Sequence, residues 1–277
     1  MIIWLASYPK SGNTFVRSLL SSYFYTQDGN FNFDLLKKIQ QFPINEDFYK
    51  IGVDVNNKYL VAENYIKAQE EIIKNKNITF LKTHSSFCKM YNRFNFSSLK
   101  TSLGVIYIVR DPRNVAISFA NHNSKPITDT VQLLMNDLAI GNEKKEVEVY
   151  LGSWNLHYNS WKVYQGSQKY LLVKYEDLIS DTKNTFLKML LFIKKLSNFE
   201  INNAKVDKAI KNTNFNRLKE MENKNGFEEA KINDNTGKKV KFFNIGPGSN
   251  WKKALEKHDQ DKIQNAFKKE MLELGYI

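Results

Sequence analysis

The feature that most constrains the fold is a short apolar run at the start of the chain, which gives way at once to a loop of small and polar residues. The run Met1–Ala6 (MIIWLA) is apolar and β-prone, and the loop after it is Ser7-Tyr8-Pro9-Lys10-Ser11-Gly12. Apolar residues between Phe15 and Tyr23 then recur at the spacing of an amphipathic helix. This order predicts a buried strand, a tight loop and a helix.

Three further apolar runs predict strands: Ile78–Leu81, Gly104–Val109 and Tyr170–Lys174. Asp111 and Pro112 fit the cap and first-turn positions of a helix after the second run, and a helix near 182–196 follows the third. Strands that alternate with helices predict an α/β fold with a central, mostly parallel sheet flanked by helices. We expect one domain over residues 1–277.

The remaining segments carry less information. Residues 28–77 and 124–168 contain no motif that we can interpret. The stretch from about 223 to 250 is polar and rich in Gly, Asn and Lys, which predicts a long, mobile, lid-like loop. An amphipathic pattern at 258–274 predicts one C-terminal helix.

Composition limits the classes of partner and site. The net charge of +12 suits polyanionic partners, although Lys residues scattered over solvated faces explain it equally well. Cys88 is the only cysteine, so no internal disulfide is expected, and the four His residues lack metal-ligand spacing. Since no apolar run reaches about 18 residues and no signal-peptide pattern is present, we expect a cytoplasmic protein without a membrane span.

The first loop has the chemistry of an anion site. Backbone amides from Ser11 to Thr14, the start of the helix and the Lys10 ammonium all favour a negatively charged ligand. In the nucleotide-binding pattern G-x-x-x-x-G-K-[ST], however, a Lys stands where this chain has Asn13. That Lys would reach the terminal phosphates of a nucleoside triphosphate, so its absence favours a nucleotide with a shorter anionic tail.

The stretch from Tyr8 to Phe15 (YPKSGNTF) resembles the 5′-phosphosulfate loop of the sulfotransferase family, whose usual form is Y-P-K-S-G-T-T-W. The resemblance implies a P-loop-NTPase-like sulfotransferase fold. It also implies 3′-phosphoadenosine 5′-phosphosulfate (PAPS) as sulfonate donor, PAP as product and no metal. Carried over residue by residue, the donor-binding positions of this loop are Lys10, Ser11, Gly12, Asn13, Thr14 and Phe15.

Other family motifs follow in order along the chain. The segment 109–118 (VRDPRNVAIS) is similar to the 3′-phosphate motif and implies that Arg110 and Ser118 bind this phosphate. Tyr175 begins a Y-E-D segment whose Tyr contacts the nucleoside in the family. Thr213 and Phe215 match the T-S-F positions that lie beside the adenine.

Lys82-Thr83-His84 stands where the family has K-T-H. The resemblance implies that His84 is the general base and that Lys82 stabilises the sulfonate, together with Lys10. An imidazole that titrates near neutrality suits the first role, and cations suit the second. The other histidines, His122, His157 and His258, are interpreted as structural.

The last motif departs from the family, which commonly has R-K-G-x-x-G-D-W where this chain has NIGPGSNW at 244–251. Gly246 and Trp251 match, but both cations are missing. Amides of Gly246 and Gly248, or the side chain of Lys239 or Lys241, are candidates to replace them. The implied donor-binding set ends with Phe242, Asn244 and Gly246.

Two other functions compete with this interpretation. A small-molecule kinase shares the anion loop but needs a metal site, for which Asp111 is the candidate, although a helix cap explains that residue better. A nucleic-acid-binding protein would cluster its basic residues with exposed aromatic ones, whereas here the only dense group is Lys238, Lys239 and Lys241. We therefore expect no nucleic acid. We expect a small acceptor with a hydroxyl or amine as the partner. The sequence leaves open which acceptor this is and whether the protein is a monomer or a homodimer.

Overall fold

A four-stranded parallel sheet forms the centre of the molecule in the computed structural model, which describes residues 1–74, 78–141, 147–233, 236–244, 246 and 250–277. The strand order is β2-β1-β5-β8, and every pair of neighbours is parallel. The strands are β1 (Ile2–Ser7), β2 (Thr79–Thr83), β5 (Ser102–Val109) and β8 (Tyr170–Lys174). The predicted α/β class, parallel sheet and four strands are confirmed.

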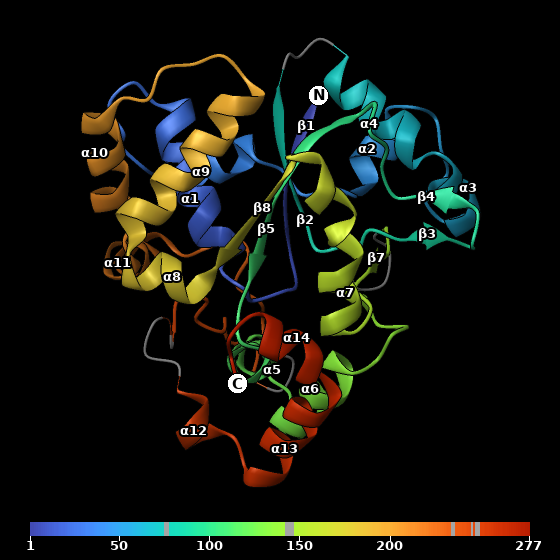
Figure 1. Cartoon of the computed structure of the whole chain (residues 1–277), viewed down its shortest axis with the longest axis vertical. Coiled ribbons are helices and arrows are strands. Elements are labelled where there is room, and N and C mark those ends of the chain that lie inside the picture. The colour runs from blue at the N-terminus through green and yellow to red at the C-terminus, as the bar shows by residue number, and fades with distance from the viewer. Residues whose placement is uncertain (75–77, 142–146, 234–235, 245, 247–249) are drawn as a thin grey trace.

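Helices cover both faces of this sheet (Figure 1). One face carries α1 (Asn13–Tyr25), α9 (Thr182–Leu196) and α10 (Asn203–Thr213). The other carries α4 (Tyr65–Ile73) and α7 (Trp154–Trp161). Four more helices gather beyond the carboxyl ends of the strands: α5 (Pro112–Asn123), α6 (Ile127–Leu134), α13 (Lys257–Ala266) and α14 (Lys268–Glu273). The remaining helices are η1 (Phe33–Lys38), α2 (Asn45–Tyr49), α3 (Lys58–Glu63), η2 (Lys162–Ser167), α8 (Tyr175–Ser180), α11 (Phe215–Asn225) and α12 (Trp251–Ala254), where η marks a 3₁₀ helix.

The alternation of side chains along β1 explains the two layers of core. Trp4 and Ala6 face the core on the α7 side, whereas Ile3 and Leu5 face the core on the α1 side. All four side chains are fully buried. A strand that is buried on both faces has no polar side, which is why the sequence shows a continuous apolar run there.

Residues left without interpretation in the sequence form small elements around the sheet. Segment 28–77 contributes η1, α2, α3 and α4, and segment 124–168 contributes α6, α7, η2 and a two-stranded pair, β6 (Ile140–Gly141) and β7 (Val149–Tyr150). A second short pair, β3 (Lys89–Met90) and β4 (Phe94–Asn95), lies between β2 and β5 in the chain. Within the described ranges, no helix is both long enough and apolar enough to cross a membrane.

Two predictions about the C-terminal part were wrong in detail. The expected helix at 258–274 is two helices, because the backbone at Phe267 leaves the helical region and its ring packs against Trp154 at 5.2 Å between centroids. The expected loop from 223 to 250 starts later, since α11 extends to Asn225. Residues 234–235, 245 and 247–249 of that loop, including Gly248, lie outside the described residues, and its mobility stays a prediction.

Candidate active site

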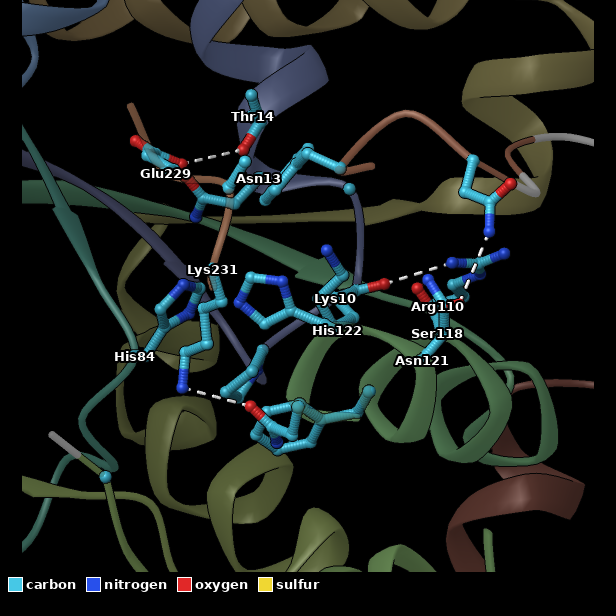
Figure 2. Close-up of a pocket in the computed structure, with 18 of the residues that line it drawn as sticks. Lys10, Asn13, Thr14, His84, Arg110, Ser118, Asn121, His122, Glu229 and Lys231 are labelled. Carbon is cyan, nitrogen blue, oxygen red and sulfur yellow. Dashed lines mark hydrogen bonds between the residues drawn. The ribbon is translucent and has the colours of Figure 1, made fainter. Parts of the chain in front are cut away.

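A cavity of about 1300 Å³ lies where the strands of the sheet end and helices begin. The three predicted catalytic residues, Lys10, Lys82 and His84, all line it. Figure 2 shows the labelled side chains that converge there. The predicted donor-binding residues in its lining are Lys10, Gly12, Asn13, Thr14, Phe15, Arg110, Ser118, Tyr175, Phe215, Phe242, Asn244 and Gly246. Ser11 and Thr213 are buried outside the lining, and the Thr213 hydroxyl donates to the Ala209 carbonyl instead.

The loop between β1 and α1 owes its shape to Gly12. Its φ of 101° lies in the left-handed region, and a Cβ there would come within 2.5 Å of the Tyr175 ring. Helix α1 starts at the next residue, so its first amides face the loop. The Asn13 side chain points back into the fold, where its Nδ2 donates to the Leu5 carbonyl at 2.9 Å and to Ser7 Oγ at 3.1 Å. Asn13 therefore anchors the loop to β1 through its side chain.

Lys10 places its ammonium in the cavity and under an aromatic ring. Its Nζ lies 3.6 Å from the centroid of the Phe242 ring. The Phe242 amide donates to the buried carboxylate of Glu222 at 2.7 Å, which holds this ring in position. Burial lowers the pKa of Lys10 to about 7, with the attraction of Glu229 opposing the shift and the repulsion of Arg110 adding to it. In the free protein this amine thus titrates near neutrality.

His84 is held by its Nδ1, which lies 2.7 Å from the Ser7 carbonyl oxygen. Because a carbonyl only accepts hydrogen bonds, Nδ1 carries the proton and Nε2 keeps its lone pair. Burial, with Lys82 adding to it, lowers the pKa of His84 well below its usual value despite the hydrogen bond to Ser7. The imidazole is therefore neutral near pH 7, with Nε2 able to accept a proton, but its pKa lies below the near-neutral range that the sequence predicts for a general base.

His157 supports His84 from the core. Its Nε2 donates to the His84 carbonyl at 3.1 Å, and its Nδ1 accepts from the Tyr107 hydroxyl at 2.7 Å. His157 is fully buried. Both of its ring nitrogens are satisfied, which agrees with its interpretation as a structural residue.

Arg110 stands at the end of β5, beside the anion loop. Its Nη1 donates to the Lys10 carbonyl at 3.1 Å, and its guanidinium lies 4.3 Å from the centroid of the Tyr175 ring. Ser118 and Asn121 on α5 flank it (Figure 2). Asn244 Nδ2 donates to Asn121 Oδ1 at 3.3 Å, so one neutral donor reaches this corner from the motif that lacks the family's cations. Polar groups from three segments of the chain meet here.

Asp111 has the structural role that its sequence position predicts. It caps α5 by accepting from the Arg113 amide at 2.9 Å, and its carboxylate is also paired with the Arg113 guanidinium at 2.7 Å. The same guanidinium lies 3.8 Å from the centroid of the Trp251 ring. Across the described residues, no three His, Cys, Asp or Glu side chains gather in the way that metal ligands do.

The sequence did not reveal Glu229 as a residue of this cavity. Its Oε2 accepts from Thr14 Oγ1 at 3.4 Å and lies 3.7 Å from Lys82 Nζ, and its Oε1 accepts from Arg17 Nη1 at 2.5 Å. Burial alone would raise the pKa of Glu229, but the charges of Lys82 and Arg17 outweigh it and hold this pKa well below its usual value. No local pattern marks this residue.

Two other missed residues are His122 and Lys231. His122 lines the cavity, with its ring edge-on to Phe242 and a buried Nδ1 that has no hydrogen-bond partner within the described part of the chain. It follows Ser118 by four residues on α5, a spacing that places both on one helix face and that could have indicated it. Burial lowers the pKa of His122 to about 3.

Lys231 lines the cavity, and its Nζ donates to Asn123 Oδ1 at 3.1 Å. The two cations predicted to replace the missing pair, Lys239 and Lys241, are not in the cavity lining.

The lining of the cavity also includes apolar side chains. Those from α5, α6, the β6–β7 region and the loop after α11 are Phe119, Leu133, Ile140, Val149, Leu151 and Ile232. Asp129, Thr130 and Gln41 add polar groups. The segment 124–168, which carries no motif, thus supplies most of these apolar side chains.

The parallel sheet and the strand-end cavity define the class as an α/β protein with a glycine-containing loop between its first strand and first helix. The family model for the sulfotransferase domain matches residues 2–275. The chain therefore belongs to the sulfotransferase family. It is 25% identical to sulfotransferase 1B1 of Canis lupus familiaris over 274 residues, which cover 97% of this chain and 83% of that protein. It is 26% identical to the 3-beta-hydroxysteroid sulfotransferase of Cavia porcellus over 182 residues, 64% of this chain and 59% of the relative.

Solved structures show the same fold. Mouse sulfotransferase SULT7A1, complexed with PAP, superposes with a TM-score of 0.62 at 18% identity, covering 97% of this chain and 83% of that chain. A retinol dehydratase in complex with androsterone and PAP superposes with a TM-score of 0.63 at 14% identity, covering 98% and 80%. These similarities confirm the predicted sulfotransferase fold.

Proposed function

We propose that this sulfotransferase moves a sulfonate group from PAPS to a hydroxyl, or an amine, of a small acceptor, with His84 as general base. The observation that carries the proposal is the short contact between His84 Nδ1 and the Ser7 carbonyl oxygen. Its Nδ1 is engaged by the Ser7 carbonyl at 2.7 Å, which leaves Nε2 as the proton acceptor in a cavity that also holds Lys10 and Lys82. A base and two cations in one cavity suit the chemistry of sulfonate transfer.

An unsatisfied group beside the anion loop fits an anionic donor. Arg110 lines the cavity, and its Nε is buried and has no hydrogen-bond partner within the described part of the chain. Buried polar groups are rarely left unpaired unless a ligand or water completes them. The amides at the start of α1, Thr14 and Lys10 would hold the 5′-phosphosulfate, and Arg110 with Ser118 and Asn244 would hold the 3′-phosphate. Tyr175 and the rings of Phe15 and Phe215 would border the nucleoside.

The proposed transfer is a single in-line displacement. His84 Nε2 takes the proton of the acceptor hydroxyl, while the acceptor oxygen forms a bond to sulfur and the bond from sulfur to the bridging oxygen breaks. The electron pair stays on the bridging oxygen, which leaves as part of the 5′-phosphate of PAP. Lys10 and Lys82 offset the charge that develops on this oxygen.

The acceptor would lie against the apolar side chains of the cavity. Phe119, Leu133 and Leu151 favour an acceptor with a hydrocarbon or ring body, and His84, which lines the same cavity, would accept the proton of its hydroxyl. The relative from Cavia porcellus is named for steroids that carry a hydroxyl group. We therefore rank hydrophobic alcohols and phenols ahead of sugars as acceptors.

The test is a transfer assay with 35S-labelled PAPS and a panel of alcohols, phenols, amines and sugars, run with and without a magnesium chelator. We expect labelled product with hydrophobic alcohols or phenols, and we expect the chelator to leave the rate unchanged. Transfer from ATP that the chelator abolishes would instead identify a kinase. No transfer to any acceptor, combined with no binding of PAP, would refute the proposed donor.

A further inference from the structure

The segment that follows α11 lines the cavity and places a carboxylate inside it. We call residues 227–233 and 236–244 the cover segment. Phe227 and Phe243 anchor it in a small apolar cluster with Leu36 of η1 and Leu218 of α11. Side chains alternate along its start: Phe227 is buried, Glu228 is exposed and Glu229 turns inward.

Glu229 occupies the partners that the proposed function assigns to the donor. The same oxygen, Oε2, is 3.4 Å from the Thr14 hydroxyl and 3.7 Å from Lys82 Nζ (Figure 2 shows the contact with Thr14). Thr14 belongs to the anion loop, and Lys82 is the predicted sulfonate ligand. The side chain of Lys82 is only 10% exposed, and the carboxylate of Glu229 offsets its buried charge.

A bound donor and Glu229 compete for these two groups. The Thr14 hydroxyl has one proton to donate, so it cannot serve a phosphosulfate oxygen and Glu229 Oε2 at once. Two anionic groups in one buried site also repel each other strongly, because little water is left to screen them. Donor entry therefore requires Oε2 to leave Thr14 and Lys82.

Arg17 keeps the displaced carboxylate within reach. Its Nη1 pairs with Glu229 Oε1 at 2.5 Å, while Nε and Nη2 donate to the carbonyls of Ile39 and Leu36. The Arg17 side chain is 5% exposed and is fixed at both ends of its guanidinium. Glu229 thus has one oxygen tethered and one oxygen in the donor site, which suits a group that is displaced and then returns.

We infer that Glu229 is a built-in competitor of the donor, which neutralises Thr14 and Lys82 in the free enzyme and lowers the affinity for PAPS and PAP. The inference rests on the proposed function, because it takes the donor site from there. A resident carboxylate would shield buried Lys82 from bulk anions and would assist release of PAP by refilling the site.

The test compares PAP binding to the wild-type chain, E229Q and E228Q by isothermal titration calorimetry. Glu228 is a matched control, since it is the neighbouring residue, carries the same charge and pairs with Lys37 at the surface. We expect E229Q to bind PAP roughly tenfold more tightly, ~1.4 kcal/mol, and E228Q to bind like the wild-type chain. Equal or weaker binding by E229Q would overturn the inference and make Glu229 a structural latch or a donor ligand.

E229Q leaves Arg17 buried without its ion pair, so the free variant is expected to melt at a lower temperature. The rise in Tm that saturating PAP produces, measured for each variant against its own free form, is therefore the second readout. This rise should be larger in E229Q, and also in E229A, than in the wild-type chain; a smaller rise in both would refute the inference. If neither the wild-type chain nor E229Q binds PAP, the proposed donor itself fails.

Discussion

The strand ends and the cover segment both line the cavity, but they hold their side chains in different ways. At the strand ends, side chains are fixed by hydrogen bonds to the sheet itself, as in the bonds from His84 to Ser7 and from Asn13 to Leu5. In the cover segment, Glu229 is held by Arg17 of α1, 212 residues away in the sequence, and Phe242 is held by Glu222 of α11, 20 residues away. The comparison teaches that the groups proposed for chemistry lie at or just after the strand ends, whereas Glu229, the proposed competitor of the donor, depends on contacts between distant segments.

The strongest test of this division is the replacement of His84. We expect H84A to lower kcat by about 10²- to 10⁴-fold, because the acceptor proton then has no positioned base. PAP affinity should be unchanged, since His84 is assigned to the acceptor rather than the donor. Steady-state kinetics with labelled donor and calorimetry with PAP give the two numbers. His258, exposed on α13, provides the control H258A. Near-full turnover in H84A would show that the base lies elsewhere.

The sequence predicts the residues at the strand ends better than those of the cover segment. The strands and the residues at their ends could be predicted because an apolar run, its loop and the next helix are contiguous in the chain. Lys10, Lys82, His84 and Arg110 all reach the cavity for this reason. The motif at 244–251 predicted fewer site residues. It lacks the two cations that the family commonly has there, and residues 245 and 247–249 lie outside the described part of the chain.

Contacts between distant segments could not be predicted. Arg17 and Glu229 are 212 residues apart, and their pairing depends on how η1 and the cover segment pack together. Thr213 matched a motif, but its hydroxyl is bonded within its own helix. A motif match fixes a position in the chain, whereas the direction of a side chain depends on packing that one sequence does not display.

The second prediction concerns Arg110, which is held by the Lys10 carbonyl and the Tyr175 ring and is proposed to bind the 3′-phosphate. We expect R110A to weaken PAP binding on the order of tenfold to a hundredfold, since a hydrogen bond to a charged group contributes about 1.5–3 kcal/mol. Calorimetry measures the change. Arg93 is exposed and pairs with the Tyr59 hydroxyl outside the cavity, so R93A is the control and should bind PAP like the wild-type chain. Equal affinities for all three proteins would remove Arg110 from the donor site.

The third prediction concerns pH and tests whether Lys10 binds the donor as a cation. Burial lowers the pKa of Lys10 to about 7 in the free protein, and a bound anion favours the protonated amine and raises this pKa. Above pH 7 binding must therefore take up a proton, so the Kd for PAP should rise by up to about tenfold per pH unit until the pH reaches the pKa in the complex. Calorimetry from pH 6 to 9 measures this slope. K10R, which stays charged, should show a flatter profile, and a slope shared by both proteins would assign the proton to another group.

The smallest effect is expected on the cover segment, at Asn244. Its side-chain amide reaches the corner beside Arg110 through Asn121, where the family commonly has a cation. A neutral hydrogen bond contributes about 0.5–1.5 kcal/mol, so N244A should weaken PAP binding about twofold to tenfold. Asn223, exposed on α11 and bonded to Lys241, provides the control N223A. A loss in N244A as large as that in R110A would mean that the cover segment carries the 3′-phosphate site, and the division between the strand ends and the cover segment would no longer hold.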